Sequence, residues 1–370
     1  MTMAPTGNNC GVGHAANRRT QEETMWSATQ AAHAAPGVRA LAFLQILLLT
    51  GATWSSPAGA EKADCTHDPD GRRWVTVGEA ADDTNLSGAA CSPDGRCLLV
   101  SDEKRRSWFF ALDDKGRAKP RIVVGEQLKL KPATGGDEAD AEGAAFDGDR
   151  FYVIGSHGAS RRSGKFEASR YSTYRIGAGG NVKASNALAA IIAGVPGIAE
   201  HFCVGATASG CQSLQDGGAN IEGLAARNGQ LYVGFRAPAP GGKAFILRIA
   251  EKALFGHADP KLGVFRVELG RDVVGRDLGV RDIAAVAGGF LILAGPSLPE
   301  GDEAVGSGRV FFWREGDEPA RLLREFSVKD KGIKPEVLLI LGEDPMAYRA
   351  MVMCDGIAGG SPTEYRLPKP

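Results

Sequence analysis

Short apolar runs alternate with turns along most of the chain, and one pattern of polar and apolar positions recurs five times. Each copy has polar and small residues at the start of a strand, a short turn, and then a second, aliphatic strand. The clearest copy covers residues 220–225 and continues with the aliphatic run 231–234. The copies start about 55 to 80 residues apart. Self-similarity at this spacing predicts a repeat architecture built from short strands.

The segments between the copies supply two more strands per unit. Residues 107–112 and 121–124 follow the first copy, and residues 170–176 follow the second. The four other copies begin at Asn85, Asp140, Val280 and Lys334. Each unit is therefore predicted to be a four-stranded antiparallel meander, which is the blade of a β-propeller.

The fifth unit is short of one strand. Residues 363–367 provide its third strand, after which the chain stops. Residues 73–79 resemble the outer strand of the first unit, so we expect this N-terminal strand to complete the last blade and close the ring, which removes exposed edges. The prediction is an all-β fold, a β-propeller of five four-stranded blades. Residues 181–218 are expected to be an insertion that runs over one face of the ring. Six blades are the alternative if an insertion hides one.

The first sixty residues are predicted to be a targeting segment. Arg39 precedes an apolar run at residues 40–49, and the small residues 58–60 follow it. This order is typical of a signal peptide whose cleavage leaves a chain that starts near Glu61. The alternative is an uncleaved membrane anchor, although the apolar run is short for a bilayer span.

Residues 1–36 are long for the start of a signal peptide, and we interpret them as an over-extended gene start, with the true start near Val38. Residues 61–370 are then expected to form a single propeller domain. The predicted location is periplasmic or secreted, with no stable membrane insertion after cleavage.

The cysteines agree with export. Seven are present, and six follow the expected cleavage site. An even number in an oxidising compartment favours disulfides, although six cysteines allow fifteen pairings. The expected pairs are Cys91 with Cys97 across a turn, Cys203 with Cys211 around a small loop, and Cys65 with Cys354 near the two ends. Zinc is the competing interpretation, but the sequence contains no C-x-x-C pair.

Composition and charge exclude some classes of function. The apolar content of 43% is that of a globular chain, and the 50 glycines suit many tight turns. The net charge of −1 gives no basic excess, so we expect no nucleic-acid partner. A monomer is expected.

The candidate chemistry lies at one mouth of the predicted channel. Four copies place an acidic residue at one position of the inner strand. These residues are Glu142, Glu222, Asp282 and Glu336, and Ser87 takes the place in the first copy. Side chains two positions earlier face the same way. They are Asn85, Asp140 and Asn220. The ends of the second strands reach the same mouth and add Asp102, His157, Arg236 and Asp355.

Acidic side chains at short range bind a cation or raise one another's pKa. Oxygen ligands favour Ca²⁺ or Mg²⁺, so we predict calcium at Glu142, Glu222, Asp282 and Glu336, and no other cofactor. The other eight residues are predicted to bind a small polar or anionic molecule. The alternative is structural, because acids at strand starts also cap backbone amides between blades.

A basic stretch at residues 157–165, which includes Arg161 and Arg162, suits either an anionic group or a solvated loop. The sequence has no G-x-S-x-G or H-E-x-x-H motif, and residues 158–165 depart from the P-loop spacing.

The repeats carry a family resemblance, and it covers most of residues 85–355. Through Ser87-Gly88, the run NIEGL at 220–224 and the strand 231–238, the chain resembles the bacterial domain-of-unknown-function family 3616. It is more distantly similar to phytase-like esterase propellers, whose blades carry a related inner strand. The first resemblance implies no established activity. The second implies calcium-assisted phosphoester hydrolysis, but the catalytic residues of that family cannot be matched one by one, and Ile283 stands where the repeat expects glycine.

Two functions follow as hypotheses. The first is an exported propeller that binds a small polar ligand or divalent cation at one channel mouth. The second is a metal-assisted hydrolase of phosphoesters or lactones, in which the four acids act as ligands or bases while Arg236 and His157 hold the substrate.

Overall fold

The computed structural model describes the part of the chain that follows the expected targeting segment. The described residues are 65–66, 68–103, 105–161, 163–203, 205, 211–299 and 305–370. They belong to one compact unit, Gly59–Pro370. The expected signal peptide and translation start lie outside them. No described helix has the length and apolar character needed to cross a membrane.

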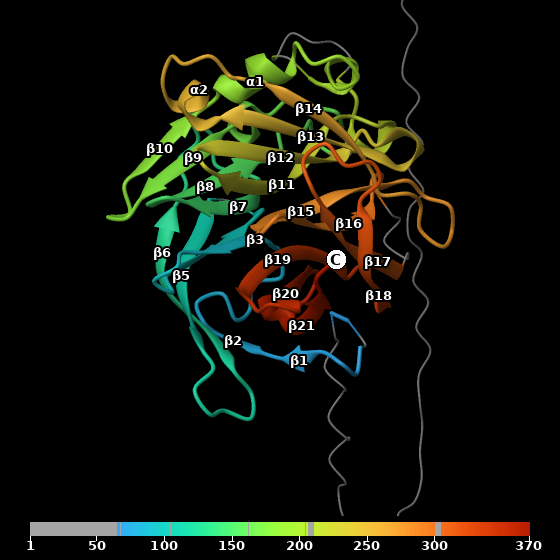
Figure 1. Ribbon diagram of the computed structural model, residues 1–370. Coiled ribbons are helices and arrows are strands. Elements are labelled where there is room, and N and C mark those ends of the chain that lie inside the picture. Colours follow the sequence, from blue (N-terminus) through green and yellow to red (C-terminus); the bar gives the residue numbers. More distant parts are fainter. Residues whose placement is uncertain are drawn as a thin grey trace, which may run out of the picture. The chain divides into compact units, whose positions relative to one another are not determined.

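The described strands form five sheets, and each contains the four antiparallel strands of one blade (Figure 1). Blade 1 has β3 (Leu86–Cys91), β4 (Cys97–Ser101), β5 (Arg106–Asp113) and β6 (Arg121–Lys129). Blade 2 has β7 (Ala141–Asp147), β8 (Arg150–Gly155), β9 (Thr173–Gly177) and β10 (Val182–Ser185). Blade 3 has β11 (Asn220–Arg227), β12 (Gln230–Ala237), β13 (Lys243–Ala250) and β14 (Gly263–Glu268). Blade 4 has β15 (Leu278–Val286), β16 (Gly289–Pro296), β17 (Val305–Trp313) and β18 (Arg321–Lys331). Blade 5 has β19 (Lys334–Glu343), β20 (Ala347–Asp355), β21 (Thr363–Pro368) and β1 (Arg72–Arg73).

The inner strands of successive blades pack against one another in a closed cycle. β3 contacts β7, β7 contacts β11, β11 contacts β15, β15 contacts β19, and β19 returns to β3. Between each pair of neighbouring blades lies a cluster of buried apolar side chains. Because both faces of most sheets are covered in this way, the strands read as continuous apolar runs in the sequence. The all-β propeller of five blades is confirmed, and the six-bladed alternative is wrong.

Ring closure uses the N-terminal segment, but the predicted single strand at residues 73–79 is wrong. β1 pairs antiparallel with β21 in blade 5, whereas β2 (Val75–Gly78) pairs parallel with β6 in blade 1. Trp74 separates the two strands. Its indole is buried among side chains of blades 1 and 5 and donates to the Glu364 carboxylate over 2.9 Å. The need to bury this side chain between the two blades explains why the segment divides there.

All three expected disulfides form. Cys91 and Cys97 face each other across the β3–β4 turn. The Cys65–Cys354 bridge ties the segment before β1 to β20, with a Cα–Cα distance of 5.5 Å. It therefore reinforces a closure in which the outer strand supplies only two residues.

The connection from blade 2 to blade 3 is the longest excursion from the ring. It contains α1 (Ala187–Ile192) and the short 3-10 turns η2 (Ala199–His201) and η3 (Leu214–Asp216). The outer strand β10 lies just before it, in a stretch that the sequence pattern assigned to the insertion. α1 packs against α2 (Glu251–Phe255), which follows β13. Three other 3-10 turns are η1 (Ala168–Arg170), η4 (Pro240–Gly242) and η5 (Ala358–Gly360).

Every inner strand carries a β-bulge at the same place. One residue there has no partner on the second strand, so the register shifts by one. The bulged residues are Ser87, Glu142, Glu222, Arg281 and Glu336. A bulge re-aims its side chain and often lies beside a functional site.

The residue after each bulge faces the next blade. At Gly143 a Cβ atom would lie 2.9 Å from both the Glu222 carbonyl oxygen and the Leu224 nitrogen. Only glycine therefore allows blades 2 and 3 to approach this closely.

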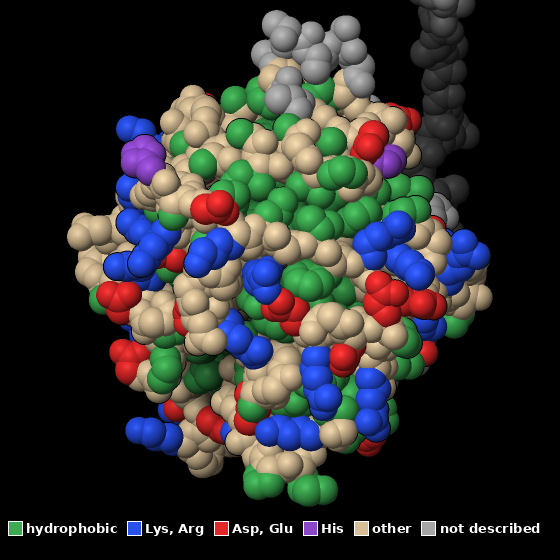
Figure 2. All heavy atoms as spheres, turned by 45° about the horizontal axis from the view of Figure 1, so that its top comes forward, with side chains coloured by type: hydrophobic (Ala, Val, Ile, Leu, Met, Phe, Trp, Pro, Cys, Tyr) green, Lys and Arg blue, Asp and Glu red, His purple; other side chains and the backbone are tan. Residues whose placement is uncertain are grey.

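On the face of the molecule shown in Figure 2, acidic and basic side chains are interspersed.

Candidate functional site

A polar pocket of about 390 Å³ lies at one mouth of the channel, on blades 1 to 3. Seven of the predicted site residues line it. They are Asn85, Asp102, Asp140, Glu142, Asn220, Glu222 and Arg236. Side chains from outside the predicted set complete the wall, namely those of Glu103, Glu138, Ala159, Ser160, Arg161, Arg170 and Leu214. Inner strands β7 and β11 supply the two glutamates through their bulges, and the ends of second strands supply Asp102 and Arg236.

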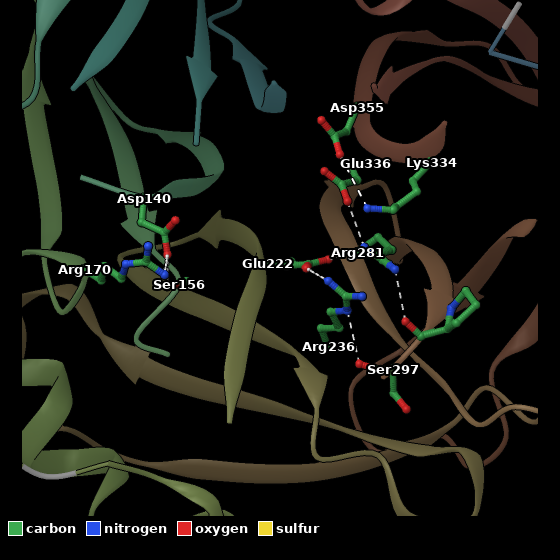
Figure 3. A network of polar contacts seen from close by, with 11 residues as sticks. Asp140, Ser156, Arg170, Glu222, Arg236, Arg281, Ser297, Lys334, Glu336 and Asp355 are labelled. Atoms are coloured by element: carbon green, nitrogen blue, oxygen red, sulfur yellow. Dashed lines mark hydrogen bonds and ion pairs between the residues drawn. The ribbon is translucent and has the colours of Figure 1, made fainter. Parts of the chain in front are cut away.

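One side of the mouth is closed by a buried network of arginines and glutamates (Figure 3). The Arg281 guanidinium donates to Glu222 over 3.1 Å and to Glu336 over 2.8 Å. Arg236 donates to the other oxygen of Glu222 over 2.8 Å and to the Ser297 carbonyl over 3.1 Å. Both arginines are at most 2% exposed. The network joins blades 3, 4 and 5, and its members Glu222 and Arg236 also line the pocket.

The carboxyl groups of this network have different pKa values. Burial alone would raise the pKa of Glu222, but Arg236 and Arg281 outweigh burial and bring it below its usual range. Burial, together with Asp355 and Glu222, raises the pKa of Glu336 to about 7. Glu222 is therefore a fixed negative charge at neutral pH.

A second ion-paired group forms the opposite wall. Asp140, which precedes β7, lies 3.3 Å from the Arg170 guanidinium and also accepts from the Ser156 hydroxyl. Arg170 donates to Glu138 over 3.0 Å. Burial raises the pKa of Asp140, and Arg170 opposes that rise. The charges of Arg170 and Asp140 are therefore both paired within the protein.

Two carboxyl groups of the pocket have no such partner. Among the described residues, the side chains of Glu142 and Asp102 form no hydrogen bond or ion pair, and Asp102 Oδ1 is buried without one. Burial and the repulsion of Glu336, Asp355 and Asp140 raise the pKa of Asp102 to about 9. Burial and the neighbouring acids raise the pKa of Glu142 well above its usual range.

The two predicted amides have different surroundings. Asn220, at the start of β11, is 9% exposed, and its Oδ1 has no partner among the described residues. Asn85 is more exposed, and its Nδ2 donates to Thr84 Oγ1 over 3.3 Å. Asn220 is therefore a buried acceptor at the pocket wall.

His157 lies away from the pocket, contrary to the prediction. Its backbone is in the left-handed region (φ 50°), which turns the chain after β8. Its Nδ1 lies 2.9 Å from the Gly155 carbonyl oxygen, and the ring packs against Tyr171. Burial lowers the pKa of His157 to about 4, so the ring is neutral at physiological pH.

Asp282 does not share the position of the repeated acids, which corrects the predicted register. Arg281 occupies the bulge, and Asp282 stands where the copies of blades 1 to 3 have glycine. The Asp282 carboxylate accepts from the Ile283 and Leu338 backbone nitrogens, both over 2.8 Å. It thus caps backbone amides between blades 4 and 5, as the structural alternative expected.

Three further predicted residues lie outside the pocket wall. The Ser87 hydroxyl donates to the Ala141 carbonyl and links blades 1 and 2. Glu336 belongs to the arginine network, and Asp355 lies 3.7 Å from Lys334 Nζ. Among the described residues, no three His, Cys, Asp or Glu side chains are grouped closely enough to hold a metal ion.

Sequence reasoning missed Arg281, although one signal was present. Glu142 and Glu222 are each followed by glycine, whereas Asp282 is followed by Ile283. Aligning Asp282 with the glycines would have placed Arg281 at the acid position. Arg170 and Glu138 gave no comparable signal, because they lie outside the repeat.

The fold and the pocket define a five-bladed β-propeller with a charged site at one channel mouth. A family model described as "Protein of unknown function (DUF3616)" matches residues 85–209 and 182–321. The chain belongs to this family. A search of curated proteins finds no match.

Solved structures with a similar chain path include enzymes of several kinds. Virginiamycin B lyase from Staphylococcus aureus is 12% identical over 80% of this chain and 69% of its own, with a TM-score of 0.33. A GH43_1 enzyme from Xanthomonas citri is 13% identical over 78% of this chain and 89% of its own, with a TM-score of 0.43. An exo-1,5-alpha-L-arabinanase from a bovine ruminal metagenomic library is 8% identical over 78% and 94%, with a TM-score of 0.38. These values carry no argument about the activity of the present chain.

Proposed function

We propose that the protein binds a cation at the channel mouth, either a divalent metal ion or the ammonium group of a small polar ligand. The observation that carries the proposal is the pair of carboxyl groups, Asp102 and Glu142, that face one pocket without any partner among the described residues. Buried polar groups in proteins are normally hydrogen-bonded, and buried charges are normally paired. A ligand cation would supply the missing partner.

The charges of the pocket wall also favour a positively charged ligand. Six acidic side chains line it, namely Asp102, Glu103, Glu138, Asp140, Glu142 and Glu222, against three arginines. Two of these arginines, Arg170 and Arg236, are already paired with acids of the wall. The pocket is therefore acidic overall, and it favours either a divalent metal ion or a protonated amine.

The test is a thermal-shift and calorimetric titration of the purified chain with Ca²⁺, Mg²⁺ and 1,4-diaminobutane, at matched ionic strength. Neutral 1,4-butanediol serves as the control ligand. We expect at least one cation to raise Tm and to bind saturably. The gain should be lost in Glu142→Gln and kept in Glu126→Gln, because Glu126 is exposed on β6 and does not line the pocket. If none of the three cations binds, the proposal is wrong.

Hydrolysis of a phosphoester or lactone is a second candidate function. Glu142 and Glu222 line the same pocket, and their pKa values move in opposite directions. Such a split is typical of a carboxyl that donates a proton beside one that stays ionised. Turnover of aryl phosphodiesters and aryl lactones tests it. An activity that Glu142→Gln abolishes without loss of Tm would support the enzyme, whereas turnover unchanged by this substitution would not.

A further inference from the structure

We propose that the ligand is a small zwitterion of the amino-carboxylate class, with its ammonium group at Asp102 and Glu142 and its carboxylate at Arg161. This deepens the proposed function and rests on it. The pocket holds unpaired acids on one wall and an unpaired guanidinium at its rim, so a ligand with both charges satisfies each of them.

Arg161 is the cation that the protein leaves available at the pocket. It lines the wall in the connection after β8 and is exposed. Among the described residues, no hydrogen bond or ion pair of its side chain is found. The positive charge of Arg161 acts to lower the pKa of Asp140, Glu222 and Asp355, as a guanidinium near these carboxyl groups would.

The loop that carries Arg161 is held by its own backbone. Ser160 N donates to the Lys165 carbonyl and Gly164 N to the Ser160 carbonyl, each over 2.9 Å. A Cβ atom on Gly164 would lie 2.6 Å from the carbonyl oxygen of Cys211, so the loop packs closely against this residue, which is linked to Cys203 by a disulfide. Arg161 is thus presented from a supported turn.

Asn220 provides an independent sign of a ligand. This side chain is nine-tenths buried, lines the pocket, and leaves Oδ1 without a partner among the described residues. An amide oxygen in this position accepts a hydrogen bond. An ammonium group carries three donors, which matches Asn220 together with the two unpaired carboxyl groups.

A carboxylate suits Arg161 better than a phosphate. A guanidinium pairs with a carboxylate through two parallel hydrogen bonds. A dianionic phosphate would bring a second negative charge into a wall that already contains six acids and has only one uncommitted arginine among its described residues. The single positive charge therefore favours a single negative charge on the ligand.

The test is calorimetric titration with a length series: glycine, β-alanine, 4-aminobutyrate and 6-aminohexanoate. Each is compared with its matched amine and its matched carboxylic acid, for example butylamine and butyrate. We expect one amino acid to bind about tenfold or more tightly than its amine, as a paired charge of this kind would give. Arg161→Gln should remove that preference. Arg117→Gln, an exposed arginine on blade 1, should keep it.

The outcomes separate this proposal from the one on which it rests. If Ca²⁺ or an amine binds but no amino acid exceeds its amine, the zwitterion is wrong and the cation site stands. If Arg161→Gln still binds the amino acid more tightly than its matched amine, the zwitterion is likewise wrong and the cation site stands. If no amino acid, amine or metal ion binds, both are wrong.

Discussion

Arg281 donates a 2.8 Å hydrogen bond to Glu336 and thereby joins blade 4 to blade 5 at the channel mouth. Both residues occupy the bulge of their inner strand, where blades 2 and 3 also carry glutamates. Arg281 is the basic residue among these acids, and it joins Glu222 and Glu336 in one ion-pair network. The remaining part of the ring, on blades 1 to 3, is left as the pocket. The function proposed above depends on this asymmetry.

Replacing Arg281 should destabilise the whole propeller. In Arg281→Met, Glu336 loses its ion-pair partner in the network and Glu222 keeps only Arg236. Removing one side of a buried ion pair costs about 3–5 kcal/mol. Urea denaturation measures the loss. Arg366→Met removes an exposed pair with Asp344 and should cost less than about 1 kcal/mol. Equal costs for the two variants would contradict the structural role given to Arg281.

A methyl group at Gly143 should separate two blades. Backbone atoms of blade 3 stand 2.9 Å from the position of the new Cβ, and backbone cannot rotate away as a side chain can. We expect Gly143→Ala to lose about 1–3 kcal/mol, the usual cost of overpacking. Gly342→Ala on β19 is the control, because its Cβ would meet nothing within 4 Å. A neutral Gly143→Ala would mean that blades 2 and 3 lie farther apart than described.

The Cys65–Cys354 disulfide should contribute more stability than the Cys91–Cys97 disulfide. The first closes a loop of 289 residues and the second a loop of 6. Loss of the long loop is expected to cost about 2–5 kcal/mol, and loss of the short one less. Thermal melts of Cys65→Ala/Cys354→Ala and Cys91→Ala/Cys97→Ala compare them directly. The reverse order would show that β1 closes the ring without help from the bridge.

Most of the fold could be predicted because the blade repeats. Each copy has its own turn and aliphatic strands, so the number of blades follows from the local pattern. The division of residues 73–79 at Trp74 could not be predicted in this way. It depends on where one large indole fits between two blades that are distant in sequence.

The site was less accessible to sequence reasoning. The repeat brought seven predicted residues to one pocket, among them Glu142 and Asn220. It failed at His157, where a left-handed backbone conformation turns the side chain away, and at Asp282, where a one-residue shift exchanges an acid for Arg281. The prediction assumed regular strands in which successive side chains alternate between the two faces of the sheet. Bulges and turns interrupt this alternation.

Stability should fall as pH rises through the neutral range, and Asp102 should account for part of the fall. Its pKa rises from 3.8 to about 9 on folding. Between these values the folded state binds the extra proton, so unfolding becomes easier as pH increases. Asp102→Asn removes this dependence. We expect the variant to be more stable than the wild type at pH 8, by more than about 1 kcal/mol, with a smaller difference at pH 4. Denaturation curves at both pH values would contradict this if the difference did not change with pH.

Proton release on ligand binding tests the central claim most directly. Burial and neighbouring acids raise the pKa of Asp102 to about 9, so this carboxyl group holds a proton near pH 7, and they also raise the pKa of Glu142. A cation that pairs with Asp102 must displace its proton. The measurement is calorimetric titration of Ca²⁺, Mg²⁺, 1,4-diaminobutane and 4-aminobutyrate at pH 7, each in two buffers of different ionisation enthalpy. The account predicts saturable binding with net proton release for at least one of these four probes, and a smaller release in Glu142→Gln. Binding without proton release, or no binding of any of the four, would contradict it.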